Sequence, residues 1–386
     1  MRRPVRVLHV ASFDGNIGDN ANHLGVRERF AQTLPTLDLG YTQFEIRETF
    51  WRQRAFDEAF AAEANAHDLV IFGGGNFFEL WVERSCNGTS VDLPIALLES
   101  IRTPILFHAL GLDVGMGAPA EHVIRFKAWL DYVLPDTRYL VSVRNDGAIQ
   151  NGREVLGAQY ADRIHSVPDG GFFYRPPAGQ QPEIQPGART IGVNIAGDML
   201  EQRFPGGDKL DYAGFVPAFA KVCSDVLDEH EDVRLVFFPH IYRDLRVAHD
   251  VLAALPDWHV RRRVSVAPYL HGDGGAERVF AIYRDCALVM GNRFHANVCP
   301  IGLGVPTIGL LNYPQVGHLY RELEIDDRLV DVRDQGFAQP LSALLGDTLV
   351  HRERVVERYQ EVNRVLDGQL TAFHGIVSQW LSNNGL

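Results

Sequence analysis

Arg293 and His295 are the residues of this 386-residue chain whose types and spacing most directly suggest chemistry. They follow residues 287–290, an apolar run with the length of a buried parallel strand, which Gly291 ends. A helix is predicted to follow at once, so both side chains are expected at a strand's carboxyl end and at a helix amino terminus. A guanidinium beside an imidazole there is typical of a site that binds phosphate or carboxylate and moves a proton. The alternative is structural, with Arg293 capping a loop and His295 bonded in a core turn.

Polar or glycine residues also follow the other predicted strands. The carboxyl ends of parallel strands share one edge of a sheet, where open α/β sheets bind ligands. Asn16 and Asp19 could orient ligand hydroxyls or act as acid or base, although either could simply cap a helix. The triple glycine after the strand at 68–72 permits a close ligand approach or a positive φ. The other candidates at strand ends are Gly74, Gly75, Asn76, Glu79, Arg144, Asp169, Asn194 and His240.

The length and the alternation of strands and helices predict an α/β chain with two Rossmann-like domains that face a cleft. Residues 175–187 are rich in proline, glycine and glutamine and make the best linker. We therefore expect an N-terminal acceptor-side domain over 1–175, a linker over 176–189 and a C-terminal donor-side domain over 190–350. Residues 351–386 are predicted to form a helix that could pack back on the first domain.

Two local predictions concern the first domain. A second strand is expected over residues 44–47, and an amphipathic helix is expected over residues 52–64. Glu79 lies in a loop rich in aromatic residues, which would suit a sugar acceptor or serve as a packed lid.

The composition excludes several classes of function. A formal charge of −12 argues against general binding of nucleic acid or anionic membranes, because these need a basic face. The four cysteines match no zinc or CxxC spacing, which indicates reduced thiols in a cytoplasmic protein. No segment approaches the ~18 apolar residues of a membrane span. HExxH, DxD and clustered His/Asp motifs are also missing, so no metal site is expected.

The order of these motifs resembles that of the polysaccharide pyruvyl transferase family, over about residues 5–320. The resemblance implies a two-domain fold like that of the GT-B glycosyltransferases. It also implies transfer of pyruvate from phosphoenolpyruvate to two hydroxyls of a sugar, glycan or lipid-linked saccharide, which forms a cyclic ketal during exopolysaccharide or cell-wall synthesis. Phosphoenolpyruvate is then a co-substrate, and no cofactor is expected. The matching residues are Asn16-Ile17-Gly18-Asp19, Gly73-Gly74-Gly75, Ser142-Val143-Arg144, Pro168-Asp169, Pro239-His240, Arg293-Phe294-His295-Ala296 and Gly304-Val305-Pro306.

The resemblance also implies roles for individual residues. Arg144, Arg293 and His295 are expected to hold the donor or act in the chemistry. His295 is the first candidate for proton transfer near the donor, and Asp19 or Asp169 would deprotonate the acceptor. The remaining donor candidates are Asn194 and His240, and the acceptor candidates are Asn16, Gly74, Gly75, Asn76 and Glu79.

One departure from the family pattern affects the donor site. The family often has a lysine in a Tyr-Pro-Lys segment, whereas this chain has Tyr313-Pro314-Gln315. A neutral amide does not replace that charge. Either His318 or Arg321 compensates, or the donor differs from phosphoenolpyruvate.

Two other functions are compatible with the sequence. One is a GT-B glycosyltransferase that uses a nucleotide-sugar donor. The other is a non-catalytic homologue that binds sugar phosphates. A peripheral contact with the inner membrane and a homo-oligomer are also compatible with the sequence.

Overall fold

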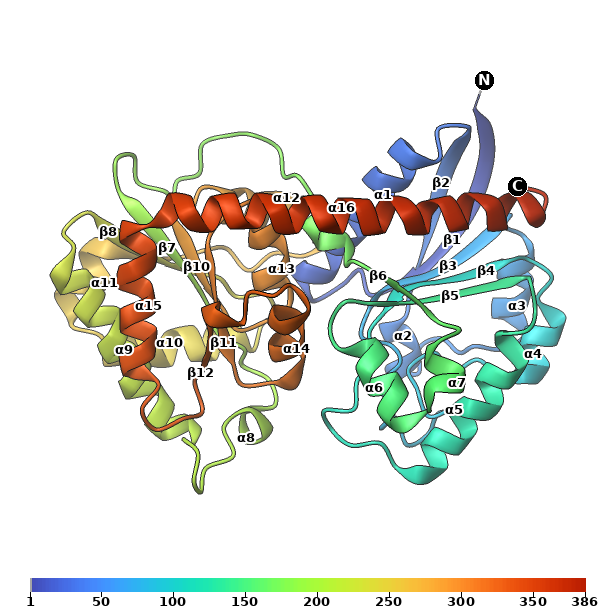
Figure 1. Cartoon of the computed structure of the whole chain (residues 1–386), viewed down its shortest axis with the longest axis horizontal. Coiled ribbons are helices and arrows are strands. Elements are labelled where there is room, and N and C mark those ends of the chain that lie inside the picture. Colours follow the sequence, from blue (N-terminus) through green and yellow to red (C-terminus); the bar gives the residue numbers. More distant parts are fainter. Residues whose placement is uncertain (1) are drawn as a thin grey trace. The chain divides into compact units, whose positions relative to one another are not determined.

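The computed structural model describes residues 2–386, which form two compact units (Figure 1). The first unit holds the residues up to Asp14, residues 22–170 and residues 365–386. The second unit holds residues 15–21 and 171–364. The chain thus enters the second unit briefly after its first strand. A division at the single linker 176–189 stays a prediction.

The first unit is built on six parallel strands in the order β2-β1-β3-β4-β5-β6. β3, β4 and β5 are buried along their whole length, which is why their sequences are apolar or glycine-rich runs without polar alternation. Its strands are β1 (Arg3–Ala11), β2 (Leu37–Glu45), β3 (Leu69–Gly75), β4 (Ile105–Leu110), β5 (Tyr139–Arg144) and β6 (His165–Val167). Its helices are most of α1 (Ile17–Thr33), α2 (Arg47–Phe50), α3 (Glu58–Asn65), α4 (Ile95–Ser100), α5 (Ala120–Val133), α6 (Ala148–Val155) and α7 (Ala158–Ala161).

The second unit also has six parallel strands, in the order β12-β11-β10-β7-β8-β9. Numbered within this unit, the order is the 3-2-1-4-5-6 of doubly wound nucleotide-binding folds. Its strands are β7 (Arg189–Asn194), β8 (Val233–Phe237), β9 (Val264–Val266), β10 (Leu288–Gly291), β11 (Thr307–Leu311) and β12 (Leu329–Asp331). Its helices are α8 (Leu200–Arg203), α9 (Tyr212–Glu229), α10 (Asp244–Ala254), α11 (Asp257–Arg263), α12 (Gly272–Arg284), α13 (His295–Gly302), α14 (Pro314–Glu322) and α15 (Ala338–Val350), with the 3-10 turns η1 (Gly170–Phe172) and η2 (Asp326–Arg328).

Each unit has its own apolar core beside its sheet. In the first unit, the rings of Phe72 and Phe107 stack with centroids 5.3 Å apart, and Trp129 of α5 packs edge-on against Phe107. In the second unit, α9 packs against α10, α11 and α15 (Figure 1). The predicted α/β class with two Rossmann-like units is confirmed.

The last helix, α16 (Arg352–Asn383), has residues in both units. Its residues from Val365 onward belong to the first unit. There the indole N–H of Trp380 donates to the carbonyl of Thr137 at 2.8 Å, and Arg29 pairs with Asp367 at 2.5 Å. The end of the chain is thus tied to helix α1 and to the loop before β5.

The prediction of a helix over residues 52–64 is wrong at its start. Helix α3 begins only at Glu58, because the carboxylate of Asp57 accepts the N–H groups of Ala59 and Phe60 and caps it. Arg52 has a φ of 57°, which no α-helix accommodates. Residues 52–57 therefore form a loop, which the apolar spacing did not reveal.

The prediction of a strand over residues 44–47 is also displaced. β2 ends at Glu45, and Arg47 already begins α2. β2 lies at the edge of its sheet and is buried only at Leu37 and at its last two residues. Its polar middle therefore lacks the apolar run that marks the central strands.

Gly302 and Gly346 provide a matched test of packing in the second unit. A Cβ on Gly302 would lie 2.2 Å from the carbonyl oxygen of Phe172, whereas one on Gly346 in α15 would meet nothing within 4 Å. We expect Gly302→Ala to lower the free energy of unfolding by about 1–3 kcal/mol through overpacking. Gly346→Ala should raise it by about 0.5–1 kcal/mol, because alanine favours a helix. Urea unfolding measures the free energy of unfolding of both variants. Equal changes in the two variants would contradict the close contact between Gly302 and the backbone of Phe172.

Candidate functional site

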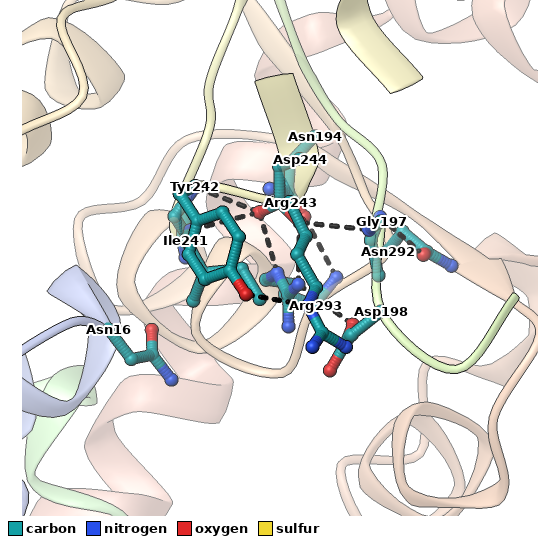
Figure 2. A network of polar contacts seen from close by, with 12 residues as sticks. Asn16, Asn194, Gly197, Asp198, Ile241, Tyr242, Arg243, Asp244, Asn292 and Arg293 are labelled. Carbon is teal, nitrogen blue, oxygen red and sulfur yellow. Dashed lines mark hydrogen bonds and ion pairs between the residues drawn. The ribbon is translucent and has the colours of Figure 1, made fainter. Parts of the chain in front are cut away.

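The carboxylate of Asp244 is the centre of a polar network in the second unit (Figure 2). Asp244 begins α10 and is 2% exposed. It accepts the backbone N–H groups of Gly197 at 2.8 Å, His240 at 2.9 Å and Ile241 at 3.2 Å. The carboxylate thereby fixes the loops that follow β7 and β8.

Arg293 binds the same carboxylate through two parallel hydrogen bonds. Its Nε donates to Oδ2 of Asp244 at 2.7 Å and its Nη2 to Oδ1 at 2.5 Å, while Nη2 also donates to Asp198 at 2.8 Å. Burial opposes ionisation of Asp244, but the charge and hydrogen bonds of Arg293 outweigh it and lower the pKa of Asp244. The predicted donor-binding arginine therefore has two carboxylate partners of its own, as Figure 2 shows.

Two asparagines join the strand ends around Arg293. Asn194, the last residue of β7, accepts the N–H of Arg293 at 2.9 Å and donates to the carbonyl of Phe238 at 2.8 Å. Asn292 accepts the N–H of Ala196 at 2.9 Å. β7 and β10 are the neighbours between which the strand order reverses, and doubly wound sheets bind ligands at this point.

His295 lies beside Asp19 in the second unit. Its Nδ1 is 3.7 Å from Oδ1 of Asp19, and the two residues are 4% and 7% exposed. A Cβ on Gly18 would lie 2.6 Å from the imidazole, so only glycine lets the ring lie against the first turn of α1. The structure thus brings together two of the three residues predicted to move protons, while Asp169 belongs to the first unit.

His240 and Asn16 each accept a backbone N–H group at the start of α1. The carbonyl of His240 accepts the N–H of Ile17 at 3.3 Å, and Oδ1 of Asn16 accepts the N–H of Gly18 at 3.1 Å. Nε2 of His240 lies 2.8 Å from the hydroxyl of Tyr283, and burial lowers the pKa of His240 to about 3. The ring is therefore neutral at physiological pH and cannot supply a positive charge to a donor phosphate.

Helix α14 includes Gln315, at the position where the family often has a lysine, and the residues that follow it. Gln315 lies in its first turn, and Nη2 of Arg321 lies 3.1 Å from Nδ1 of His318 on an exposed face. Nearby in the network, the buried Arg203 donates to Asn312 at 3.0 Å and lies over the ring of Tyr313.

In the first unit, Arg144 and Asp169 form a second buried network. Nε of Arg144 donates to Asp146 at 2.7 Å, and its Nη1 lies 3.5 Å from Oδ2 of Asp169. The same Oδ2 accepts Nδ2 of Asn22 at 2.5 Å, and the N–H of Asp169 donates to Asn145 at 3.0 Å. Asp169 has no exposed surface, so its carboxylate is held within the protein.

The end of β3 and the loop after it hold four of the predicted acceptor residues. Gly74 has the positive φ, 73°, that the triple glycine indicated. Gly75 is the last residue of β3, and Nδ2 of Asn76 donates to Asp113 at 2.9 Å. Glu79 accepts the hydroxyl of Ser90 at 2.6 Å, and burial raises its pKa to about 7. A carboxyl group of that pKa can both give and take a proton near neutral pH.

The structure groups the predicted residues by unit. Arg144, Asp169, Gly74, Gly75, Asn76 and Glu79 belong to the first unit, and Asn16, Asp19, Asn194, His240, Arg293, His295, Gln315, His318 and Arg321 belong to the second. Asn16 was expected beside the acceptor loops but belongs to the second unit. Among residues 2–386, no group of three or more His, Cys, Asp or Glu side chains is arranged to hold a metal. No helix of the same residues combines the length and apolar character needed to cross a bilayer.

Sequence reasoning missed Asp198, Arg203 and Asp244. The available signal for Asp244 was its position, because it follows Pro239-His240 closely and begins a helix. An acidic residue at a helix start is, however, ordinarily explained by the helix dipole. Its partner Arg293 is distant in sequence, so the pairing became visible only in the folded structure.

A family model described as polysaccharide pyruvyl transferase matches residues 16–313. No curated protein matches the sequence.

A glycosyltransferase structure from Rickettsia africae is similar, with 9% identity, a TM-score of 0.58 and 99% of each chain covered. HepE of Anabaena, solved with UDP and glucose, has 10% identity and a TM-score of 0.53 over 98% of this chain and 100% of its own. A UDP-N-acetylglucosamine 2-epimerase has 11% identity and a TM-score of 0.51, over 93% and 91%. These similarities show the fold alone and confirm the predicted GT-B-like architecture.

Replacing Asp244 by asparagine tests the central ion pair. We expect Asp244→Asn to destabilise the protein by about 3–5 kcal/mol, because it leaves the buried Arg293 with one carboxylate fewer. Asp257→Asn, which removes an exposed pair with Arg261, should cost at most about 1 kcal/mol. Urea unfolding at neutral pH compares the two variants, and equal losses would contradict the central role of Asp244.

The same pair has a predicted pH dependence. The pKa of Asp244 is lower in the folded protein than in the unfolded chain, where it is about 3.9. Its stabilisation is therefore complete above about pH 4 and is lost as the pH falls through the folded value. Asp244→Asn should lose less stability than the wild type over that acidic interval.

The contribution of Glu79 to stability should change with pH in the opposite direction. Its folded pKa of about 7 lies above the unfolded value, so the folded protein binds a proton that the unfolded chain releases between about pH 4.3 and 7. Ionised Glu79 therefore lowers stability as the pH rises through this range. Between pH 4.5 and pH 8, we expect the free energy of unfolding of Glu79→Gln to rise by on the order of 3 kcal/mol relative to that of wild type. A difference that is constant across pH would contradict the raised pKa.

Proposed function

This chain belongs to the polysaccharide pyruvyl transferase family, and we propose that it transfers pyruvate from phosphoenolpyruvate to two hydroxyls of a sugar or glycan, forming a cyclic ketal. The observation that carries this proposal is the pairing of His295 with Asp19 at the edge of the second sheet. Ketal formation from an enol phosphate needs a proton donor near the donor carbon, and an imidazole is suited to that step at neutral pH. We further propose that the reaction takes place in the cytoplasm, with phosphoenolpyruvate as its only co-substrate.

The proposed reaction begins with proton transfer from His295 to the methylene carbon of the donor. A sugar hydroxyl then attacks the oxocarbenium-like carbon and loses its proton to a base. The C–O bond to phosphate breaks, and the second hydroxyl closes the ring and loses its own proton. The carboxylate of Asp19 attracts the protonated imidazole and orients it toward the donor.

The donor carries a phosphate and a carboxylate, which need positive groups in the second unit. The guanidinium of Arg293 is held by Asp244 and Asp198, so we assign it chiefly the role of ordering the strand ends around it. Arg321, beside His318 on an exposed helix face, is our candidate for the charge that Gln315 does not provide.

We assign the acceptor to the first unit, at Gly74, Gly75, Asn76 and Glu79. Glu79 is the group there whose pKa suits removal of a hydroxyl proton. Asp169 is fully buried and already accepts hydrogen bonds from Asn22, so positioning suits it better than proton transfer.

The assay combines the purified protein with phosphoenolpyruvate and a panel of free, nucleotide-linked and lipid-linked saccharides. Phosphate release and acceptor mass are measured together, and a gain of pyruvate less water is expected. His295→Gln should lower kcat at least ~100-fold, because it removes the proton donor. Arg321→Gln should mainly raise KM for phosphoenolpyruvate.

His351→Gln is the matched control. His351 also lies beside a carboxylate, Asp347, but at an exposed position between α15 and α16 in the second unit, so its replacement should leave turnover unchanged. If folded wild-type protein neither binds phosphoenolpyruvate nor modifies any acceptor, the proposal is wrong. Turnover of a nucleotide sugar by the same protein would then identify a glycosyltransferase.

A further inference from the structure

A cavity of about 1140 Å³ opens in the first unit beside the predicted acceptor loops. Residues 49, 50 and 52–57, after β2, and residues in the range 82–94, after β3, line it together with Arg125 of α5. We propose that this cavity binds the phosphate or pyrophosphate group of an anionic saccharide acceptor. The inference rests on the proposed pyruvyl transfer and adds the chemical class of its acceptor.

Three arginines in the lining have no carboxylate partner among residues 2–386: Arg52, Arg84 and Arg125. Nε and Nη2 of Arg125 are also buried without a hydrogen-bond partner among these residues. A buried donor without a partner is costly, and guanidinium groups are suited to binding phosphate oxygens in pairs. The buried arginines Arg144 and Arg293, in contrast, each bind carboxylates directly.

Most of the other charges in the lining are already engaged. Arg54 pairs with Glu63 at 2.5 Å and with Glu48 at 3.8 Å. Asp57 caps α3, and Asp92 accepts the N–H of Cys86 at 2.6 Å.

Glu83, which is exposed, is the remaining carboxylate of the lining. The lining thus holds four arginines and three carboxylates, a small positive excess in a chain whose formal charge is −12. This local excess of positive charge favours an anionic ligand.

The cavity is connected to the acceptor residues through Ser90. Ser90 lines the cavity, and its hydroxyl donates to Glu79 at 2.6 Å. A phosphate held by the arginines would therefore leave its attached sugar near the carboxyl group proposed to take the hydroxyl proton. Phe50, which is 51% exposed, adds an aromatic surface to the same lining.

The volume also fits a ligand larger than a phosphate. Small-molecule sites usually measure about 300–1,000 Å³, so this cavity has room for a saccharide beside its phosphate. Saccharides carry such groups when linked to a nucleotide or to a polyisoprenyl lipid. Both sources share the pyrophosphate group, and the proposal concerns that shared chemistry.

The test measures binding by calorimetry to wild type, Arg84→Gln, Arg125→Gln and the double variant. The probes are inorganic pyrophosphate, UDP, farnesyl pyrophosphate and phosphoenolpyruvate. We expect the double variant to bind pyrophosphate at least 10-fold more weakly than wild type and to retain its affinity for phosphoenolpyruvate. Arg84 is exposed, so Arg84→Gln keeps the test valid if Arg125→Gln does not fold.

Two variants serve as controls. Arg102→Gln removes an exposed arginine of the same unit that does not line the cavity, and it should leave pyrophosphate affinity unchanged. Glu83→Gln removes the unengaged carboxylate of the lining and should bind pyrophosphate as tightly as wild type or more tightly. Wild-type affinity in the double variant, or an equal loss in Arg102→Gln, would overturn the proposal.

The remaining outcomes separate the two sources and the two proposals. Tighter arginine-dependent binding of UDP than of farnesyl pyrophosphate supports a nucleotide-linked acceptor, and the reverse supports a lipid-linked one. If wild type shows no phosphoenolpyruvate-dependent mass gain on any acceptor, the proposed function fails irrespective of pyrophosphate binding. If transfer occurs with uncharged saccharides as efficiently as with phosphorylated ones, only the acceptor inference fails.

Discussion

The buried ion pair of Asp244 and Arg293 is the interaction on which the arrangement of the strand ends in the second unit depends. Burying either charge alone would be unfavourable, so each residue requires the other. The carboxylate also accepts three backbone N–H groups, and the arginine backbone is bound by Asn194. The ends of β7, β8 and β10 are thereby held in one arrangement, and His295 follows directly on this fixed frame.

The arginines of this protein differ in whether they form ion pairs with carboxylates. Arg144 and Arg293 are paired with carboxylates, so their charge is largely neutralised and serves to hold loops in place. Arg84 and Arg125 have no such partners among the described residues, and they line the cavity of the first unit. The same residue type therefore occurs in two environments, and only the absence of carboxylate partners leaves a guanidinium able to bind another anion.

The sequence predicted the architecture better than the details of the sites. Apolar runs such as residues 69–72 are set by burial on both faces, so the central strands and the α/β class could be predicted. The edge strand β2 and the loop before Glu58 were misplaced, because a polar edge and a single cap residue leave weak local signals. Motif order identified His295 and Asp19 as separate candidates, but neither their contact nor the Asp244–Arg293 pair could be predicted, because tertiary contacts alone bring these residues together.

The assignment of Asn16 to Asp19 to the second unit limits how the chain can be recombined. This short segment comes from the start of α1, yet Gly18 and Asp19 lie against the imidazole of His295. A chimera joined at the proline-rich linker would therefore take the two partners from different parents. Compatible exchange between homologues therefore requires that residues 15–21 and residues 171–364 come from the same parent, although they are separated in the gene.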